Sequence, residues 1–308
     1  MKINKQKIFS VLLIFAFALT VNPITVLADT DIDLKTAAFE GHTQTVRSLI
    51  SDGADINTKD SRGETALMAA SIMDHTDIVK TLIASGADIN AIDSNGETAL
   101  MAAAYTGQIE TVKILLASGA DVNIRDLKNE TALMEAAYAG HAQIVDTLLS
   151  VNADVNIHNI QKESALMFAA LSGHTDIVKS LIKSGAKIDT QNCKGRTALS
   201  YASLRGQTEA ARILIASGAD VNSPDLLKET ALMAAAYGGH TNTVSLLLEN
   251  GANVNAKDSV GRTALIYASG KKNIQAENLL IANGADVNIS DILENSPIMQ
   301  ASLVCDHI

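Results

Sequence analysis

The sequence repeats itself every 33 residues, and this fixed interval limits the folds that the chain can adopt. "GETALMAAS" begins at Gly63, and "GETALMAAA" begins at Gly96. An alignment of the chain on itself needs no gap from Ser61 to Asp291. A period of this size is typical of a stacked array, in which each unit contacts only its neighbours.

Full blocks of 33 residues occupy positions 61–291, preceded by a partial first repeat at 33–60. A fragment at 292–308 follows them and is expected to cap the array. The repeat array as a whole is therefore expected to span residues 29–308. The full blocks begin at Ser61, Ser94, Leu127, Ile160, Cys193, Leu226 and Ser259.

Each block is expected to contain two short helices. The first runs from Thr98 to Thr106 in one block, with Thr98 as the N-cap. The second runs from Ile109 to Ser118 and stops at Gly119, where a left-handed residue is expected. Hydrophobic residues make up 47% of the chain but aromatics only 3%, which suits closely packed helices. Because such short helices are unstable alone, the blocks must stack into an all-α array.

The blocks resemble ankyrin repeats. Three features carry the resemblance: Thr-x-Leu opens the first helix, Gly-His separates the helices, as at Gly140-His141, and "GADVN" closes the block, as at 119–123. The resemblance covers about 270 residues and implies an all-α solenoid of stacked helix-turn-helix units with hairpin loops. It also implies that partner proteins bind the concave face and the hairpin tips.

Two departures from the family pattern change the expected contacts. Ala66 and Ala99 stand where the family has Pro, and Met68 and Met101 stand where it has His. We expect these methionines to make apolar contacts with the next repeat. Asn152 replaces the Gly that ends the second helix, and Asn tolerates a left-handed conformation.

The first 28 residues have the pattern of a signal peptide. Lys2, Lys5 and Lys7 precede an apolar run at 8–21, and small residues lead to a cleavage site near Ala28. We expect an exported protein, periplasmic, on the cell surface or secreted, with an uncleaved anchor as the alternative. The cleaved chain would carry 21 basic and 34 acidic residues. Such a surface repels phosphate, so no nucleic-acid partner is expected.

No group of residues in the sequence indicates catalysis, a cofactor or a metal. Histidines that share one repeat position would stand about 10 Å apart, too far to bind one ion. We expect them to hydrogen-bond within their own repeats, and the Asp of each "GADVN" to bond nearby amides. The histidines at this repeat position are His42, His75, His141, His174 and His240. A non-enzymatic protein is therefore expected.

Cys193 and Cys305 are three repeats apart and should not pair with each other. We expect free thiols in a monomer, with an intermolecular bridge as the alternative.

One position varies among large side chains, two residues before the Gly between the helices. We expect these side chains to form an exposed stripe that anchors a protein partner. Their packing between repeats as ordinary core is the alternative. They are Phe39, Ile72, Tyr105, Tyr138, Leu171, Leu204 and Tyr237.

The hairpins carry a second set of candidates. Leu127, Ile160, Leu226 and Leu227 are apolar at predicted tips, where exposure is unfavourable unless a partner covers them. Arg62, Glu97 and Glu130 add charge, and the glutamates predict a basic or polar patch on the partner.

These features predict a scaffold that binds an unidentified partner protein. The alternatives are an inhibitor or protector of an exported enzyme, and a secreted effector that acts on host proteins.

Overall fold

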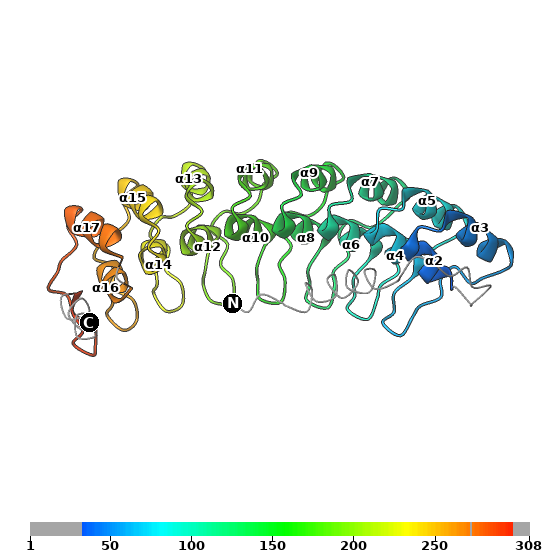
Figure 1. Ribbon diagram of the computed structural model, residues 1–308. Helices are drawn as coiled ribbons and strands as arrows, with labels where there is room; N and C mark the ends of the chain where they lie inside the picture. Colours follow the sequence, from blue (N-terminus) through cyan, green and yellow to red (C-terminus); the bar gives the residue numbers. More distant parts are fainter. Residues whose placement is uncertain (1–32, 272, 298–308) are drawn as a thin grey trace, which may run out of the picture. The chain divides into compact units, whose positions relative to one another are not determined.

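A computed structural model describes residues 33–271 and 273–297 (Figure 1). In this part of the chain there are 16 α-helices and no strand, which confirms the expected all-α fold. The predicted signal peptide, Cys305 and most of the C-terminal fragment lie outside the described residues.

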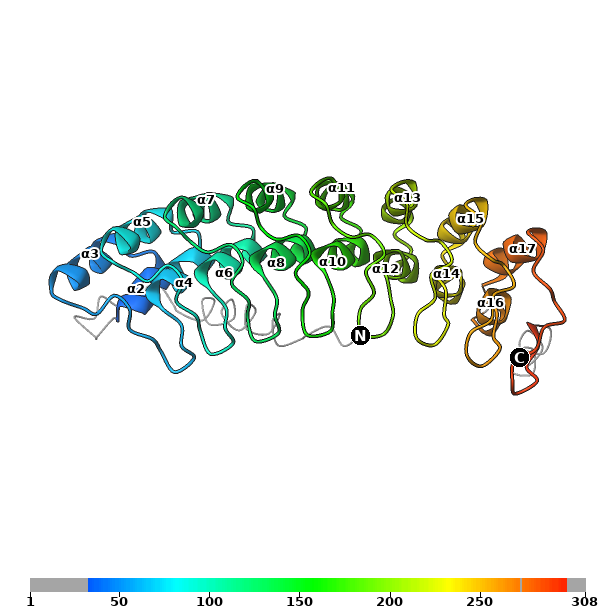
Figure 2. The ribbon, with the colours of Figure 1, turned by 180° about the vertical axis from the view of Figure 1, so that it is seen from behind.

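The helices alternate between two layers, and the hairpins extend beyond one of them (Figures 1 and 2). The first helices of the repeats are α2 (Leu34–Glu40), α4 (Ala66–Ile72), α6 (Ala99–Thr106), α8 (Ala132–Ala139), α10 (Ala165–Ser172), α12 (Ala198–Arg205), α14 (Ala231–Gly238) and α16 (Ala264–Gly270). The second helices are α3 (Thr43–Ser51), α5 (Thr76–Ala84), α7 (Ile109–Ala117), α9 (Ala142–Ser150), α11 (Thr175–Lys183), α13 (Thr208–Ala216), α15 (Thr241–Glu249) and α17 (Ile274–Ala282).

The helix boundaries follow from the capping residues. The Thr98 hydroxyl accepts a hydrogen bond from the Met101 amide at 3.2 Å, as predicted for an N-cap. Such a bond is worth about 1 kcal/mol to the helix. Helix α7 ends one residue earlier than expected, and Gly119 after it has φ +94°, the expected left-handed conformation. Asn152 also adopts a left-handed conformation, with φ +63°.

Small side chains allow the first helices to pack closely. Each first helix contacts the first helices of the neighbouring repeats as well as its own second helix. Ala103 and Ala104 are fully buried in this packing. Met68 and Met101 are buried in the same core, as expected for methionines that replace a polar residue.

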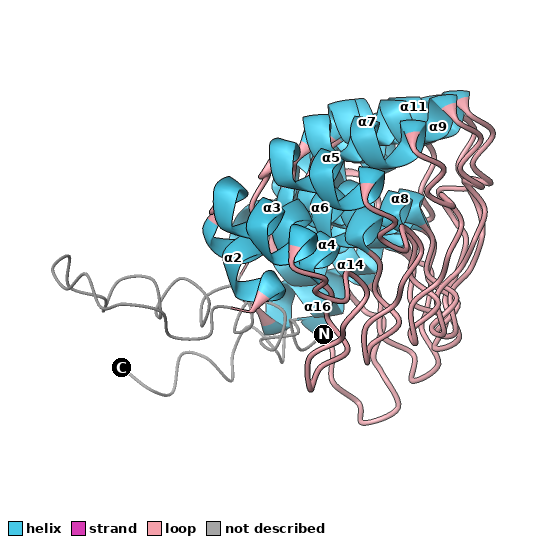
Figure 3. Ribbon diagram, turned by 90° about the vertical axis from the view of Figure 1, so that its right-hand side faces the viewer, coloured by secondary structure: helices cyan, strands magenta, loops and turns pink. Residues whose placement is uncertain are grey.

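Backbone hydrogen bonds hold neighbouring hairpins in register, and the hairpins line one side of the helices (Figure 3). The Leu127 amide donates to the Asn95 carbonyl of the preceding hairpin at 2.8 Å. Within the hairpin, Asp126 accepts from the amides of Lys128 and Glu130. The same inter-hairpin bond joins Ser94 to Arg62, Ile160 to Lys128, Cys193 to Gln161, Leu226 to Lys194, Ser259 to Leu227 and Ile292 to Val260.

The expected role is wrong for four of the five histidines, because they bond to the preceding repeat and not to their own. His42 does contact its own repeat, with Nδ1 3.3 Å from Glu40 Oε2. His141 Nε2 lies 3.0 Å from the Tyr105 carbonyl oxygen. Carbonyl groups in the last turn of a helix have no amide donor within that helix. The loop between the two helices of the following repeat places the histidine ring next to such a carbonyl. Gln108 donates to the Ile72 carbonyl in the same way, at 3.2 Å. Equivalent bonds join His75 to Phe39, His174 to Tyr138 and His240 to Leu204.

The "GADVN" segments make the expected local bonds and also link the repeats. Asp121 accepts from the Asn123 amide at 2.9 Å, as predicted for a loop-forming carboxylate. The Asn123 side chain in turn accepts from the Asp154 amide of the next repeat, also at 2.9 Å.

Candidate partner-binding surface

The predicted stripe consists of the seventh residues of the first helices from α4 to α14 and of Phe39, the sixth residue of α2, and the structure interrupts it. Tyr138 and Tyr237 are 37% and 46% exposed. Leu171 is only 7% exposed and belongs to the core, so it is not available as an anchor. A helical projection gives the direction of a side chain but not how closely the next repeat approaches it. Phe39, Ile72, Tyr105 and Leu204 are half-buried.

The hairpin tips expose their apolar side chains. Leu127 and Leu226 are 73% and 72% exposed, and Ile160 and Leu227 are also exposed. Only the hairpin of the α14 repeat presents two such side chains next to each other among the full repeats.

The charged candidates bond to neighbouring hairpin residues. Arg62 Nη2 lies 2.9 Å from Glu64 Oε2. Glu130 accepts from the Asn159 amide group at 3.3 Å.

A recurring three-residue contact links the first helices to the hairpins. It joins the fourth residue of a first helix to the residues nine and 38 positions before it, and we call it a junction. In the α12 junction the Tyr201 hydroxyl donates to Glu163 and accepts from Asn192 Nδ2 at 2.9 Å.

The α16 junction is built in the same way. The Tyr267 hydroxyl lies 2.9 Å from both Glu229 Oε1 and Asp258 Oδ2. The Tyr267 ring also packs edge-on against Tyr237, with 6.0 Å between the ring centroids.

Burial raises the pKa of Tyr201 and of Tyr267, and hydrogen bonds to carboxylates raise it further. Glu163 accepts from Tyr201, and Tyr267 shares its single hydroxyl proton between Glu229 and Asp258. Both phenols are therefore neutral donors at neutral pH.

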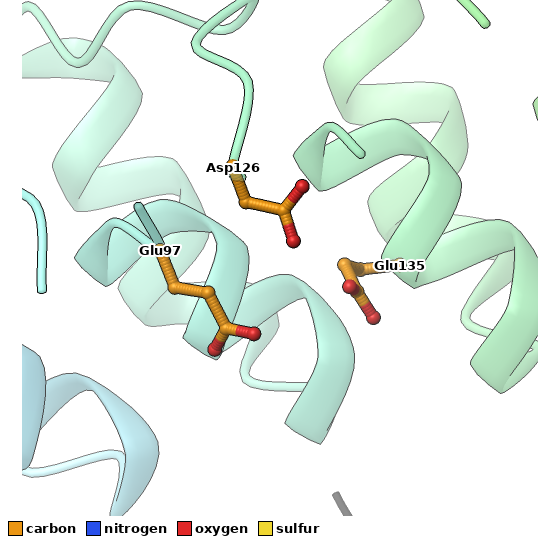
Figure 4. Close-up of side chains that lie close together, drawn as sticks. All are labelled: Glu97, Asp126 and Glu135. Atoms are coloured by element: carbon orange, nitrogen blue, oxygen red, sulfur yellow. The ribbon is translucent and has the colours of Figure 1, made fainter. Parts of the chain in front are cut away.

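The α8 junction consists of three carboxylates, those of Glu97, Asp126 and Glu135 (Figure 4). One oxygen from each lies within 4.8 Å of the others, and Asp126 and Glu135 are buried. Carboxylate oxygens are suitable ligands for Ca²⁺ or Mg²⁺, but three carboxylates alone do not define an ion site.

Elsewhere in the described residues, cations of the chain itself pair with carboxylates at junction positions. Lys35 forms ion pairs with Asp60 and Glu64. Burial lowers the Lys35 pKa, but the hydrogen bonds to these two carboxylates outweigh it, so the pKa is raised. Arg196, which stands where the α8 junction has Glu97, places its Nε 3.2 Å from Asp225 Oδ2.

The α14 junction contains a hollow of about 310 Å³. Its fourth residue is Ala234, where the junctions on both sides have tyrosines. Arg196, Asp225 and Tyr237 are among the lining residues.

Four of the candidate residues from the sequence lie in the lining of the hollow or on the hairpin next to it. Leu204 and Tyr237 line it, and Leu226 and Leu227 belong to the hairpin that supplies its Asp225 wall. The remaining candidates are distributed over other repeats.

The fourth position of the first helices, which corresponds to the third residue of α2, was not among the candidates from the sequence, although its variation distinguishes it. Most residues around it are invariant alanine or leucine, whereas this position changes in size and charge. Its residues are Thr36, Ala69, Ala102, Glu135, Phe168, Tyr201, Ala234 and Tyr267.

None of the helices in the described part of the chain is both long enough and apolar enough to span a membrane.

Comparison with known proteins supports the architecture. A family model described as ankyrin repeats (3 copies) matches residues 34–126, 92–159, 133–225 and 218–291. A search of curated proteins returned no match. Since the matches together span residues 34–291, the chain belongs to the ankyrin-repeat family.

Proposed function

We propose that the chain is a non-enzymatic scaffold that binds a protein partner through its first helices and hairpin tips. Ankyrin repeats are generally protein–protein interaction modules. The observation that carries the proposal is the exposure of Leu226 and Leu227, 72% and 55%, on the hairpin whose Asp225 lines the hollow, together with Tyr237, 46% exposed in the lining of the same hollow. Exposed apolar groups of this kind usually mark an interface.

The composition of this group fits the centre of a binding surface. Tyrosine and arginine dominate the energetics of protein interfaces, and Tyr237, Arg196 and Arg262 all line the hollow. The paired charges around it form a polar rim, and the inter-hairpin bond between Leu226 and Lys194 holds the tip in place. Such pre-organisation lowers the entropic cost of binding.

A capture experiment tests this surface. Leu226→Asp/Leu227→Asp removes the exposed apolar tip without disturbing the backbone bonds of the hairpin. We expect the purified variant to lose at least tenfold in affinity for the native partner, because a desolvated apolar anchor contributes more than 1.4 kcal/mol.

The equivalent tip residues four repeats earlier are Ser94 and Asn95, which are exposed and polar. Ser94→Asp/Asn95→Asp therefore adds the same charge at a matched position and should retain the partner. Equal binding by both variants and the wild type would contradict the proposal. Recovery of a host protein alone would favour an effector, and a captured exported enzyme would favour an inhibitor or protector.

We also propose that the protein acts after export, because residues 1–28 have the signal-peptide pattern. N-terminal sequencing of the protein purified from its natural source should give Asp29 as the first residue. A start at Met1 would exclude cleavage.

A further inference from the structure

The array itself shows what fits into the space above Ala234. In α12 and α16 the equivalent residues are Tyr201 and Tyr267, and each ring places its hydroxyl between the residues nine and 38 positions earlier. Those positions correspond to Asp225 and Arg196 for Ala234, and both line the hollow. The hollow therefore has the place of a phenol ring that the chain does not supply at this junction.

The polar groups of the hollow complement a hydroxyl. Arg196 binds Asp225 through Nε and Glu229 through Nη2, and its Nη1 carries two further N–H donors. A hydroxyl placed as in Tyr201 can accept from the guanidinium and donate to Asp225. An aliphatic side chain would make neither hydrogen bond.

The apolar walls favour an aromatic ring. Tyr237 and Tyr267 meet at an interplanar angle of 81°, and Met233 and Ala234 also line the hollow. A third aromatic ring in the hollow would make favourable edge-to-face or stacked contacts with these two rings. A volume of about 310 Å³ is at the lower end for ligand pockets, which suits one large side chain.

We propose that the α14 hollow is a docking pocket for a tyrosine side chain of the partner protein, which deepens and rests on the scaffold function proposed above. The tyrosine ring inserts over Ala234, and its hydroxyl binds Arg196 and Asp225. The exposed side chains of Leu226 and Leu227 then contact the partner chain that flanks this tyrosine.

A fragment titration tests the pocket without the partner. N-acetyl-L-tyrosinamide is added to the full chain with labelled alanine and methionine methyl groups, observed by NMR. We expect saturable shifts of the Ala234 and Met233 methyls with a Kd of roughly 1 mM. N-acetyl-L-phenylalaninamide should bind about tenfold more weakly, because it lacks the hydroxyl that bonds to a charged group. Absence of saturable shifts at these methyls, or equal affinity for N-acetyl-L-leucinamide, would overturn the proposal.

Filling the pocket from within provides the second test. Ala234→Tyr should fold with an unchanged or higher Tm, because Tyr201 and Tyr267 fit equivalent places, and it should abolish the tyrosinamide shifts. Ala102→Tyr places the same side chain at the equivalent position of α6 and should leave the shifts intact. An unfolded Ala234→Tyr variant, or one that still binds the fragment, would contradict the proposed fit.

A second copy of the chain, as the occupant of the hollow, would give a different result from a partner tyrosine. A dilution series in which the Ala234 methyl shifts with protein concentration would assign the hollow to a second copy of the chain and overturn the proposal. The fragment titration does not depend on partner capture, so failure to capture a partner would count against the scaffold function alone.

Discussion

At the scale of single residues, polar side chains connect one repeat to the next. His141 bonds to the carbonyl of Tyr105, and Gln108 makes the same kind of bond to Ile72. Each contact satisfies a carbonyl at the end of a helix, where the helix itself supplies no donor. The repeat position therefore requires a donor of suitable reach and does not require imidazole.

His141→Ala should lower the free energy of unfolding by about 1 kcal/mol, the usual net value of such a hydrogen bond. His141→Gln should retain most of that stability, because Gln108 makes this bond in the neighbouring repeat. Urea unfolding followed by circular dichroism measures both. Equal losses in the two variants would show that the ring contributes by packing alone.

The buried phenols predict sensitivity to alkaline pH. The pKa of Tyr201 is raised in the folded state, so its contribution is complete below the unfolded value of about 10 and is lost as the pH rises above it. Tyr201→Phe should therefore lose less stability than the wild type between about pH 9 and pH 11. Urea midpoints across this range test the sign, with the exposed Tyr138→Phe as the control. A steeper loss in Tyr201→Phe would refute it.

At the scale of elements, the turn between the two helices is fixed by glycine and by the next repeat together. Gly140 has φ +91°, and a Cβ there would lie 2.6 Å from His174 Cε1. Gly119, after the second helix, has φ +94° but would place its Cβ more than 4 Å from other atoms. Substitution of Gly119 therefore tests backbone strain alone, whereas substitution of Gly140 tests backbone strain together with a steric clash.

Gly119→Ala should cost about 1 kcal/mol, the strain of a left-handed alanine. Gly140→Ala should cost a further 1 to 3 kcal/mol or so, because the His174 ring must move away from the Tyr138 carbonyl that it contacts. Thermal and urea unfolding of the two variants give the comparison. If both lost the same stability, the His174 contact would be flexible enough to absorb the methyl group.

At the scale of the whole molecule, stability is distributed over many similar contacts between neighbours. Each first helix packs on the adjacent first helices, and the core continues through all the repeats in the described residues.

Charge is not distributed evenly: positions 33–160 contain 18 acidic and eight basic residues, and positions 161–297 contain 13 of each. The expectation of a basic patch on the partner opposite the N-terminal repeats stays a prediction.

Removal of the last repeat should shorten the array without unfolding it. A chain that ends at Lys257 lacks α16 and α17 and should keep its helical content in the remaining repeats, because only the α14–α15 pair loses a neighbour. The urea m-value should fall by roughly one eighth, in proportion to the surface lost. Global unfolding of this chain would show that the terminal repeat is needed for nucleation or capping.

The repeat, the two helices of each block, their caps and the burial of the methionines could be predicted from the residues alone. These features are local, and the same signals recur in every block, so a period and a capping residue are sufficient to place them. Thr98, Gly119 and Asn152 could be assigned without knowledge of any neighbour.

The side chains that meet across repeats became known only from the packing of the repeats. The sequence could not show that His141 bonds to the preceding repeat, that Leu171 is buried, or that Ala234 leaves a hollow beside Arg196. These contacts join residues about one repeat apart, and they depend on the distance and rotation between stacked units. Periodicity gives the order of the units along the chain, whereas packing sets the geometry between them.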